Sequence, residues 1–239
     1  MLIYAHRGNS SVYPENTMPA FRSAVESGAH GIETDVHCTS DGVLVLTHDE
    51  EISKVSDGKG MIKDMTYAEL LTYDFGSWKG EAFKGERIPR LEELLDLLED
   101  TGMMLNIELK MGFLLYPDIE EQVLDLVKKR GFLSRVIFSS FNHYSLDKIR
   151  KLDKDALTAP LYTSGLFEPY SYALTFQANA IHPYYLSIDR SIVEECHKRN
   201  LLVNLWTVND PALVKTFEAM GIDGIITDHP QELMKILRS

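Results

Sequence analysis

The feature that most constrains the fold is a series of eight short strand-like runs, each followed by a segment of helical character. Between the first two runs, for example, Phe21, Ala24 and Val25 recur at helical spacing. Eight such units in 239 residues predict an α/β fold, a single (β/α)8 TIM-type barrel over residues 1–239. A doubly wound open sheet is the alternative, but no GxGxxG motif follows the first run. The runs begin near Leu2, Gly31, Met104, Arg135, Ala156, Ala180, Leu202 and Gly224.

Two segments depart from this regular alternation of strands and helices. Residues 50–87 carry glycines and the aromatic residues Phe75, Trp78 and Phe83. They predict a small insertion after the second strand, at the C-terminal face of the barrel. An aromatic insertion there would serve as a lid that selects what enters the mouth of the barrel, or equally as a contact between two copies. Residues 166–176 predict a helix from a weaker pattern.

Composition restricts the partners of this chain. The formal net charge is −12 and no basic block occurs, which argues against binding to nucleic acids and to anionic membranes. Because no run approaches the roughly 18 apolar residues of a spanning helix and no signal peptide is evident, we expect a cytoplasmic protein without stable membrane association. Cys38 and Cys196 are too few for a disulfide framework, and we expect both to be buried. An oligomeric state does not follow from the composition.

Acidic residues crowd one short stretch, residues 31–49. Because side chains alternate along a strand, Glu33 and Asp35 share a face. The turn at Asp41-Gly42 predicts a hairpin that returns His48 toward them. Like charges this close indicate a divalent metal site, although exposed acids on a solvated strand are the more common explanation of an isolated ExD pattern.

In a TIM barrel the C-terminal ends of the strands form the active site. Glu108 and Lys110 share a face of the third barrel strand, where an ordinary ion pair is the simpler explanation. If Glu33, Asp35 and Glu108 are neighbours, three oxygen ligands favour Mg²⁺ or Ca²⁺, and zinc only if a histidine also binds. The other polar residues expected at this mouth are His6, Arg7, Ser140, His182, Trp206 and Asp228.

An ordered set of short motifs along the whole chain resembles the glycerophosphodiester phosphodiesterase family. Each motif alone is weak, whereas the set in this order is specific. The motifs are His6-Arg7-Gly8, Pro14-Glu15-Asn16-Thr17, Glu33-Thr34-Asp35-Val36, Asp41-Gly42, His48-Asp49, Ile88-Pro89, Glu108-Leu109-Lys110, Trp206-Thr207-Val208-Asn209 and the closing run from Gly224 to Pro230.

The resemblance implies a barrel enzyme that hydrolyses a small glycerophosphodiester to sn-glycerol 3-phosphate and an alcohol. It implies that Glu33, Asp35 and Glu108 hold the metal and that His6 and His48 form an acid and base pair, without saying which is which. It also implies that Trp206 packs against the glycerol of the substrate, although a core aromatic is nearly as common.

Charge and geometry add to these implied roles. Arg7 and Lys110 are suited to neutralise the phosphate. A glycerol hydroxyl held next to the phosphorus would attack it to give a cyclic phosphate that water then opens. Asn16 is expected either to form a hydrogen bond near the phosphate or to cap the following helix, and capping is the favoured role. For His182, lining of the mouth and a place in the core are equally expected.

Two other functions compete with this one. A phosphodiesterase of phospholipase type acting on lysolipids fits the same barrel, but no basic rim or membrane-facing helix supports it. A non-catalytic metal-dependent binding protein is the other alternative. The pair His6 and His48 argues against it, because binding alone does not require two groups that titrate near neutral pH.

Overall fold

The structure is a computed structural model that describes residues 1–110 and 116–238. Within these ranges nine strands form one sheet, in the order β1-β9-β8-β7-β6-β5-β4-β2-β3, and pairing of β1 with β2 closes eight of them into a barrel. All barrel strands pair in parallel, as the sequence predicts. They are β1 (Leu2–His6), β2 (Gly31–Cys38), β4 (Met104–Leu109), β5 (Val136–Ser140), β6 (Leu157–Tyr162), β7 (Ala180–Pro183), β8 (Leu202–Leu205) and β9 (Gly224–Thr227).

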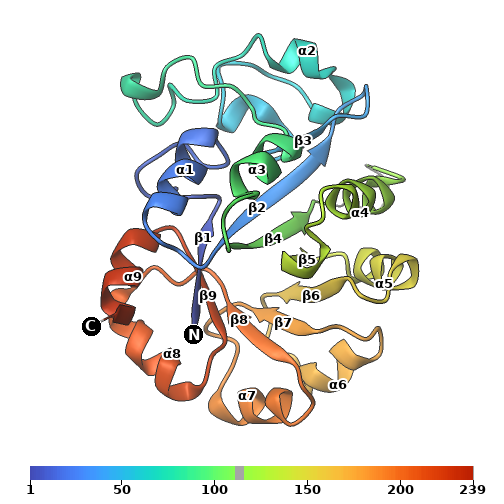
Figure 1. Ribbon diagram of the computed structural model, residues 1–239, viewed down its shortest axis with the longest axis vertical. Coiled ribbons are helices and arrows are strands. Elements are labelled where there is room, and N and C mark those ends of the chain that lie inside the picture. The colour runs from blue at the N-terminus through green and yellow to red at the C-terminus, as the bar shows by residue number, and fades with distance from the viewer. Residues whose placement is uncertain (111–115, 239) are drawn as a thin grey trace.

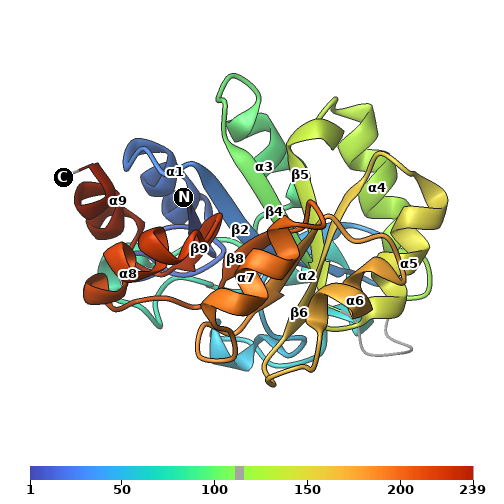
Figure 2. The same ribbon diagram turned by 90° about the horizontal axis from the view of Figure 1, so that it is seen from below.

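Helices surround the strands, and in Figures 1 and 2 they follow one another around the outside of the barrel in chain order. Within the described residues, no helix has the length and apolar character needed to cross a membrane. The outer helices are α1 (Met18–Glu26), α3 (Leu91–Leu98), α4 (Ile119–Lys129), α5 (His143–Leu152), α6 (Pro169–Leu174), α7 (Arg190–His197), α8 (Val214–Met220) and α9 (Pro230–Arg238).

Helix α6 differs from the sequence prediction, and helix α8 is preceded by a different kind of turn. Helix α6 is shorter than the predicted 166–176, because Glu168 has a left-handed backbone (φ 46°) and Pro169 starts the helix. Before α8, Asp210 accepts a hydrogen bond from the backbone N–H of Ala212, and Pro211–Leu213 forms a 3₁₀ turn rather than the first α-helical turn.

The predicted hairpin extends the barrel wall. Strand β3 (Leu44–Leu46) pairs antiparallel with the end of β2. Beyond it, residues 50–87, which include α2 (Tyr67–Leu70), lie past the ends of β2 and β3 in Figure 1. This segment also contains the 3₁₀ turns Ile52–Lys54, Ile62–Asp64 and Glu81–Phe83. Its buried apolar side chains form a small core of their own with Val45 and Ile88.

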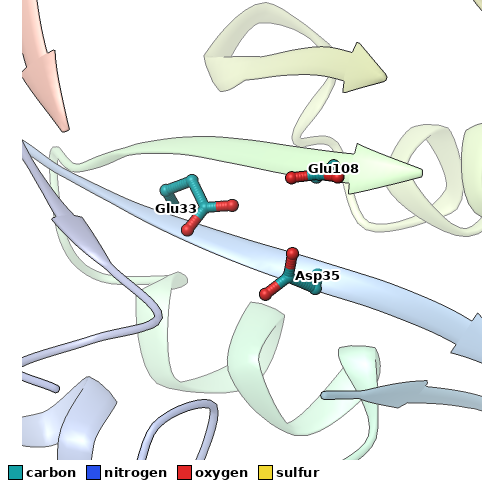
Figure 3. A group of neighbouring side chains, drawn as sticks. All are labelled: Glu33, Asp35 and Glu108. Atoms are coloured by element: carbon teal, nitrogen blue, oxygen red, sulfur yellow. The ribbon is translucent and has the colours of Figure 1, made fainter. Parts of the chain in front are cut away.

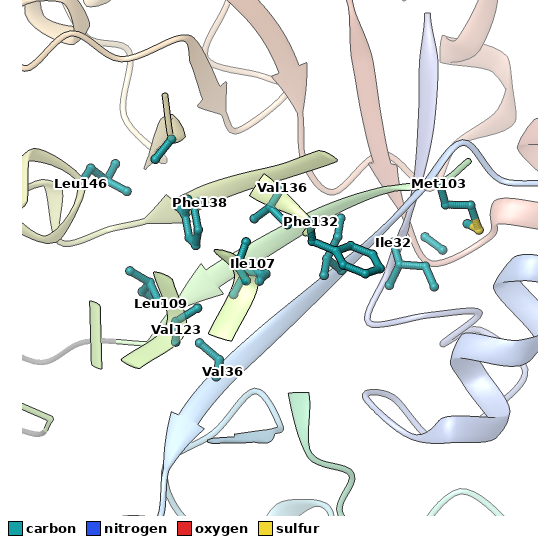
Figure 4. Packing of buried hydrophobic residues seen from close by; sticks show 14 of the residues in the cluster. Ile32, Val36, Met103, Ile107, Leu109, Val123, Phe132, Val136, Phe138 and Leu146 are labelled. Carbon is teal, nitrogen blue, oxygen red and sulfur yellow. The ribbon is translucent and has the colours of Figure 1, made fainter. Parts of the chain in front are cut away.

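The main core lies between the outer face of the strands and the helices. Figure 4 shows Ile32 and Val36 of β2 and Ile107 and Leu109 of β4 in this layer. The alternate residues of the same strands point into the barrel. Since both faces of β2 are buried, Glu33 and Asp35 lie inside the barrel rather than on a solvated strand face.

The barrel interior is filled in layers. A small apolar layer of Ile137, Ala159 and Ala180 packs with Met104 and Leu157. Polar side chains also occupy the interior, and they include Asn106, Ser139, His182 and Asn204, each at most 3% exposed.

Two glycines make room for large interior side chains near the start of the strands. A Cβ atom at Gly31 would lie 2.5 Å from the ring of Tyr4. At Gly224 it would lie 2.3 Å from Asn204 Oδ1. Glycine at these two positions therefore permits the interior packing of Tyr4 and Asn204.

Of the two places equally expected for His182, the structure shows the core and not the mouth. It is 1% exposed, and its Nε2 lies 2.9 Å from the side-chain amide of Asn204. Burial lowers the pKa of His182 to about 3. The barrel core therefore holds His182 in its neutral form at neutral pH.

This burial makes stability depend on pH. Between the ordinary pKa of 6.5 and the folded-state pKa of about 3, the unfolded chain binds a proton that the folded chain excludes. His182 therefore destabilises the fold as the pH falls through this window, by up to about 1.4 kcal/mol per pH unit. We expect the free energy of unfolding, measured by urea titration at pH 6.5, 5.5 and 4.5, to fall more steeply in the wild type than in His182→Gln. Equal slopes would contradict a buried neutral His182.

Candidate active site

Three carboxylates meet inside the C-terminal end of the barrel. Glu33 and Asp35 come from β2 and Glu108 from β4, and Figure 3 shows them gathered between these two strands. One oxygen of each lies within 4.8 Å of the others, and all three residues are buried. The strand register causes this meeting, because Asp35 pairs directly with Glu108 and both point inward.

Two cations partly compensate these charges. Lys110 Nζ lies 3.0 Å from Asp35 Oδ1 and 2.7 Å from Glu108 Oε1. Arg7 Nε lies 3.3 Å from Asp35 Oδ2, and its guanidinium also donates to Glu15 Oε1 at 2.8 Å. For both cations, burial disfavours the charge, but the surrounding carboxylates outweigh burial and raise the pKa above its ordinary value. Arg7 and Lys110 are therefore permanently charged at neutral pH.

The three carboxylates differ in pKa because nearby positive charges neutralise them to different extents. Burial favours the neutral acid at Asp35, yet Lys110 and Arg7 outweigh it and hold the pKa of Asp35 well below its usual range. Burial raises the pKa of Glu108 to about 7. Burial and the charges of Asp35 and Glu108 raise the pKa of Glu33 well above its usual range. The protein alone therefore does not stabilise three ionised acids here.

The donor set fits a divalent cation. Three carboxylates face two basic side chains, so one negative charge remains when all are ionised. Among the described residues, the ion pairs of Glu33 include only His6, at 3.9 Å from Nε2 to Oε2. Clustered carboxylate oxygens are the ligands that hard divalent ions prefer, and such an ion would supply the missing positive charge.

His6 lies at the end of β1 and is held by an acid. Its Nδ1 lies 2.6 Å from Asp228 Oδ1, and because a carboxylate only accepts, Nδ1 carries the proton. Asp228 also accepts from Ser10 at 3.1 Å and from Asn209 at 2.5 Å. Burial opposes its charge, but the hydrogen bond and charge of His6, together with these donors, hold the pKa of Asp228 well below its usual range. The free Nε2 of His6 is thereby directed toward Glu33.

His48 follows β3 and lines a cavity together with Glu108. Its Nδ1 lies 3.2 Å from Asp49 Oδ1, and its backbone oxygen lies 3.2 Å from the ring of His37. Burial, reinforced by the charges of Lys110 and Arg7, lowers the pKa of His48 below its ordinary value. His48 is therefore able to accept a proton at neutral pH.

Two connected cavities contain these groups. A narrow one of about 70 Å³ contains His6, Glu33 and Glu108 in its lining, whereas a wider one of about 540 Å³ contains His48, Glu108 and Lys110. Glu108 lines both. A ligand that occupies both cavities next to Glu108 would thus meet both imidazoles.

Trp206 closes the narrow cavity from β8. Its indole N–H donates to the backbone oxygen of His182 at 2.7 Å, and its ring meets Phe141 edge to face with centroids 5.5 Å apart. The position agrees with its predicted place at the mouth. Phe141, from the loop after β5, lines both cavities and was not predicted.

The favoured role of Asn16, capping of α1, is wrong, since Thr17 and not Asn16 is the N-cap residue. Asn16 instead donates from Nδ2 to Asp35 Oδ2 at 2.8 Å and accepts from Thr34 Oγ1 at 2.7 Å. It therefore fixes the orientation of the Asp35 carboxylate.

Asn106 also escaped prediction, although it lies two residues before Glu108 on the inward face of β4. It is 2% exposed and lines the narrow cavity. Because alternate residues of a strand share a face, the spacing of Asn106 and Glu108 in the sequence could have predicted this position. The expected burial of Cys38 and Cys196 is confirmed, and both are free thiols.

The barrel and its mouth define a TIM-barrel enzyme in which carboxylates, imidazoles and fixed cations share one site. The sequence model of the Glycerophosphoryl diester phosphodiesterase family matches residues 6–232. A glycerophosphodiester phosphodiesterase of Caldanaerobacter subterraneus is 44% identical over 237 residues, covering 99% of this chain and 98% of that protein. One from Bacillus altitudinis is 38% identical and covers 98% and 97%.

A solved structure agrees. The Oleispira antarctica phosphodiesterase in complex with the product sn-glycerol-3-phosphate superposes with a TM-score of 0.91 at 28% identity, covering 100% of this chain and 97% of that one. The chain belongs to the glycerophosphodiester phosphodiesterase family and is a phosphoric diester hydrolase.

Divalent ions should stabilise the folded protein through the acid cluster. At a hundred times the dissociation constant we expect a gain of about 2.7 kcal/mol, or a melting temperature about 5 to 10 °C higher. Glu33→Gln should lose most of this gain, whereas Glu218→Gln on the exposed face of α8 should keep it. Thermal unfolding with chelator, Mg²⁺ and Ca²⁺ measures the difference. An equal increase in Glu33→Gln would argue against the cluster as the metal site.

Proposed function

We propose that this enzyme hydrolyses small glycerophosphodiesters to sn-glycerol 3-phosphate and an alcohol, with Glu33, Asp35 and Glu108 holding Mg²⁺ or Ca²⁺. The observation that carries this proposal is the buried carboxylate cluster next to two fixed cations and between two histidines. Family membership and the product bound to the Oleispira relative support the substrate class.

Charge is the first problem that the site must solve. A phosphodiester is anionic, and so is this protein, with a net charge of −12. Arg7 and Lys110 provide fixed positive charge within the mouth, Arg7 as a planar fork and Lys110 as a point charge. A divalent ion at the acid cluster, when bound, would neutralise further phosphate charge and lower the pKa of a coordinated hydroxyl.

The second problem is proton transfer, for which His6 and His48 are the proposed pair. Each ring has its Nδ1 beside a carboxylate, Asp228 for His6 and Asp49 for His48. This arrangement leaves Nε2 of each imidazole for the reaction. One histidine accepts the proton of the attacking hydroxyl, and the other donates a proton to the departing alcohol.

The nucleophile in this proposal is the glycerol hydroxyl adjacent to the ester. Its oxygen forms a bond to phosphorus, the bond from phosphorus to the alcohol oxygen breaks, and a cyclic glycerol phosphate results. Water then opens the ring while the histidines reverse their roles. A neighbouring hydroxyl held in place reacts with a large effective molarity, so this route requires little of the protein beyond positioning. Trp206 would form the apolar wall against the glycerol carbons.

Substrate range and metal dependence form one experiment. We expect release of glycerol 3-phosphate from glycerophosphocholine, glycerophosphoethanolamine and glycerophosphoglycerol, and near-complete loss of this release with chelator. Addition of Mg²⁺ or Ca²⁺ should restore it, because three acids without an ion would repel the phosphate. Full activity in metal-free protein would contradict the proposed role of the cluster.

Both histidines should be essential. His6→Ala and His48→Ala should each lower kcat on glycerophosphocholine by at least about 100-fold, which is the lower range for lost general acid or base catalysis. His197→Ala on α7, remote from the mouth, is the matched control and should retain the wild-type rate. Circular dichroism verifies that each variant is folded. A near-wild-type rate in either mutant would remove that histidine from the mechanism.

The cyclic route has its own test. In water labelled with ¹⁸O, the first step should leave the phosphate unlabelled, and rapid quenching should trap cyclic glycerol phosphate. A substrate with the adjacent hydroxyl methylated should not react. Label in the product of that methylated substrate would show direct attack by water instead.

A further inference from the structure

A third histidine, His37, lies next to the groups that the proposed reaction uses. It shares the inward face of β2 with Glu33 and Asp35, and it lines the wider cavity together with His48. The residue is nevertheless 0% exposed. The proposed reaction gives this histidine no role.

Both ring nitrogens of His37 are engaged within the protein. Nε2 lies 3.2 Å from the backbone oxygen of His48, and Nδ1 lies 2.8 Å from the hydroxyl of Tyr116. Because a carbonyl oxygen only accepts, Nε2 carries a proton and donates it to His48. Burial favours the neutral ring, so Nδ1 accepts from the Tyr116 hydroxyl. His37 therefore has no free nitrogen with which to bind or protonate a substrate.

Tyr116 anchors these hydrogen bonds in the main core. It precedes α4, is 4% exposed, and packs among the apolar side chains between the strands and the helices. Its ring meets the imidazole of His37 edge to face, with centroids 5.6 Å apart. The ring contact and the hydroxyl together hold the imidazole of His37 in one orientation.

The chain at His48 has just left the barrel wall. His48 lies outside helices and strands, shortly after β3 ends at Leu46. Its ring contacts Asp49, but Asp49 is the next residue of the same turn and moves with it. The bond from His37 instead comes from β2, a strand that pairs with β1 and β4. It therefore connects the turn that carries His48 to a rigid part of the barrel.

We propose that His37, held by Tyr116, is a positioning residue for His48, because its hydrogen bond to the His48 backbone sets the place of the His48 imidazole in the mouth. The inference rests on the proposed function, in which His48 transfers a proton. A displacement of about 1 Å at a reacting group can cost about 100-fold in rate. Loss of this bond should therefore act on kcat rather than on substrate binding.

His37→Leu removes the donor to the His48 backbone. We expect kcat on glycerophosphocholine to fall about 10- to 100-fold, with KM within about twofold of the wild type. His37→Gln should restore most of the rate, because its amide N–H can donate to the same backbone oxygen.

His30→Leu is the matched control. It also removes a histidine that bonds the backbone, since Nδ1 of His30 accepts from the N–H of Ile3 at 3.1 Å. His30 lies at the start of β2, at the end of the barrel opposite the mouth. This variant should retain the wild-type kcat.

A double-mutant cycle separates positioning from a general loss of structure. If His37 acts through His48, His37→Leu should cause no further loss of kcat in the His48→Ala background. Tyr116→Phe removes only the hydroxyl, so it should lower kcat about three- to tenfold in the wild-type background and not at all with His48→Ala. The melting temperature of His37→Leu should respond to Mg²⁺ as that of the wild type does, because the acid cluster is unchanged.

Three results would overturn the inference and leave the proposed function intact. They are an unchanged kcat in both His37→Leu and Tyr116→Phe, a further loss of equal size in the His48→Ala background, and a lost Mg²⁺ response in His37→Leu alone. If His37→Leu does not fold, the cycle with Tyr116→Phe decides in the same way. A wild-type rate in His48→Ala would instead overturn the proposed role of His48 itself.

Discussion

Repulsion among Glu33, Asp35 and Glu108 is the interaction on which the rest of the site depends. Buried carboxylates this close cannot all stay ionised without compensation, and the barrel wall holds them in place because they alternate with the core residues of β2 and β4. Arg7 and Lys110 compensate part of the charge. In the proposed function, a divalent cation would supply the positive charge that is still missing and would in turn bind the phosphodiester.

Residues next to the carboxylate cluster hold the charged groups of the site in fixed positions. Asn16 orients Asp35, and Glu15 holds the guanidinium of Arg7. Asp228 fixes the proton of His6 on Nδ1 and so directs Nε2 toward Glu33. None of these contacts transfers a proton in the proposed reaction, but each limits the positions that a reacting group can adopt.

The order of strands and the inward faces of β2 and β4 could be predicted because both depend on local patterns. Alternation along a strand places Glu33, Asp35 and Glu108, and the turn at Gly42 places His48. The orientation of His182 and the role of Asn16 could not be predicted, because each depends on a partner far along the chain, Asn204 and Asp35. Similarly, the late start of α6 depends on the left-handed backbone of Glu168, which no periodicity records.

The distribution of the site along the barrel has a further consequence. Every proposed acid, base, cation and metal ligand lies between residues 6 and 110, either on β1, β2 and β4 or shortly after β1, β3 and β4. Phe141, Leu161 and Trp206 come from the later strands and their loops. In the proposed function, the early strands of the barrel thus supply the reacting groups, and the later strands shape the space for the substrate. Substitutions on the later strands would then change which substrates fit the site, without altering the proposed acid, base, cations and metal ligands.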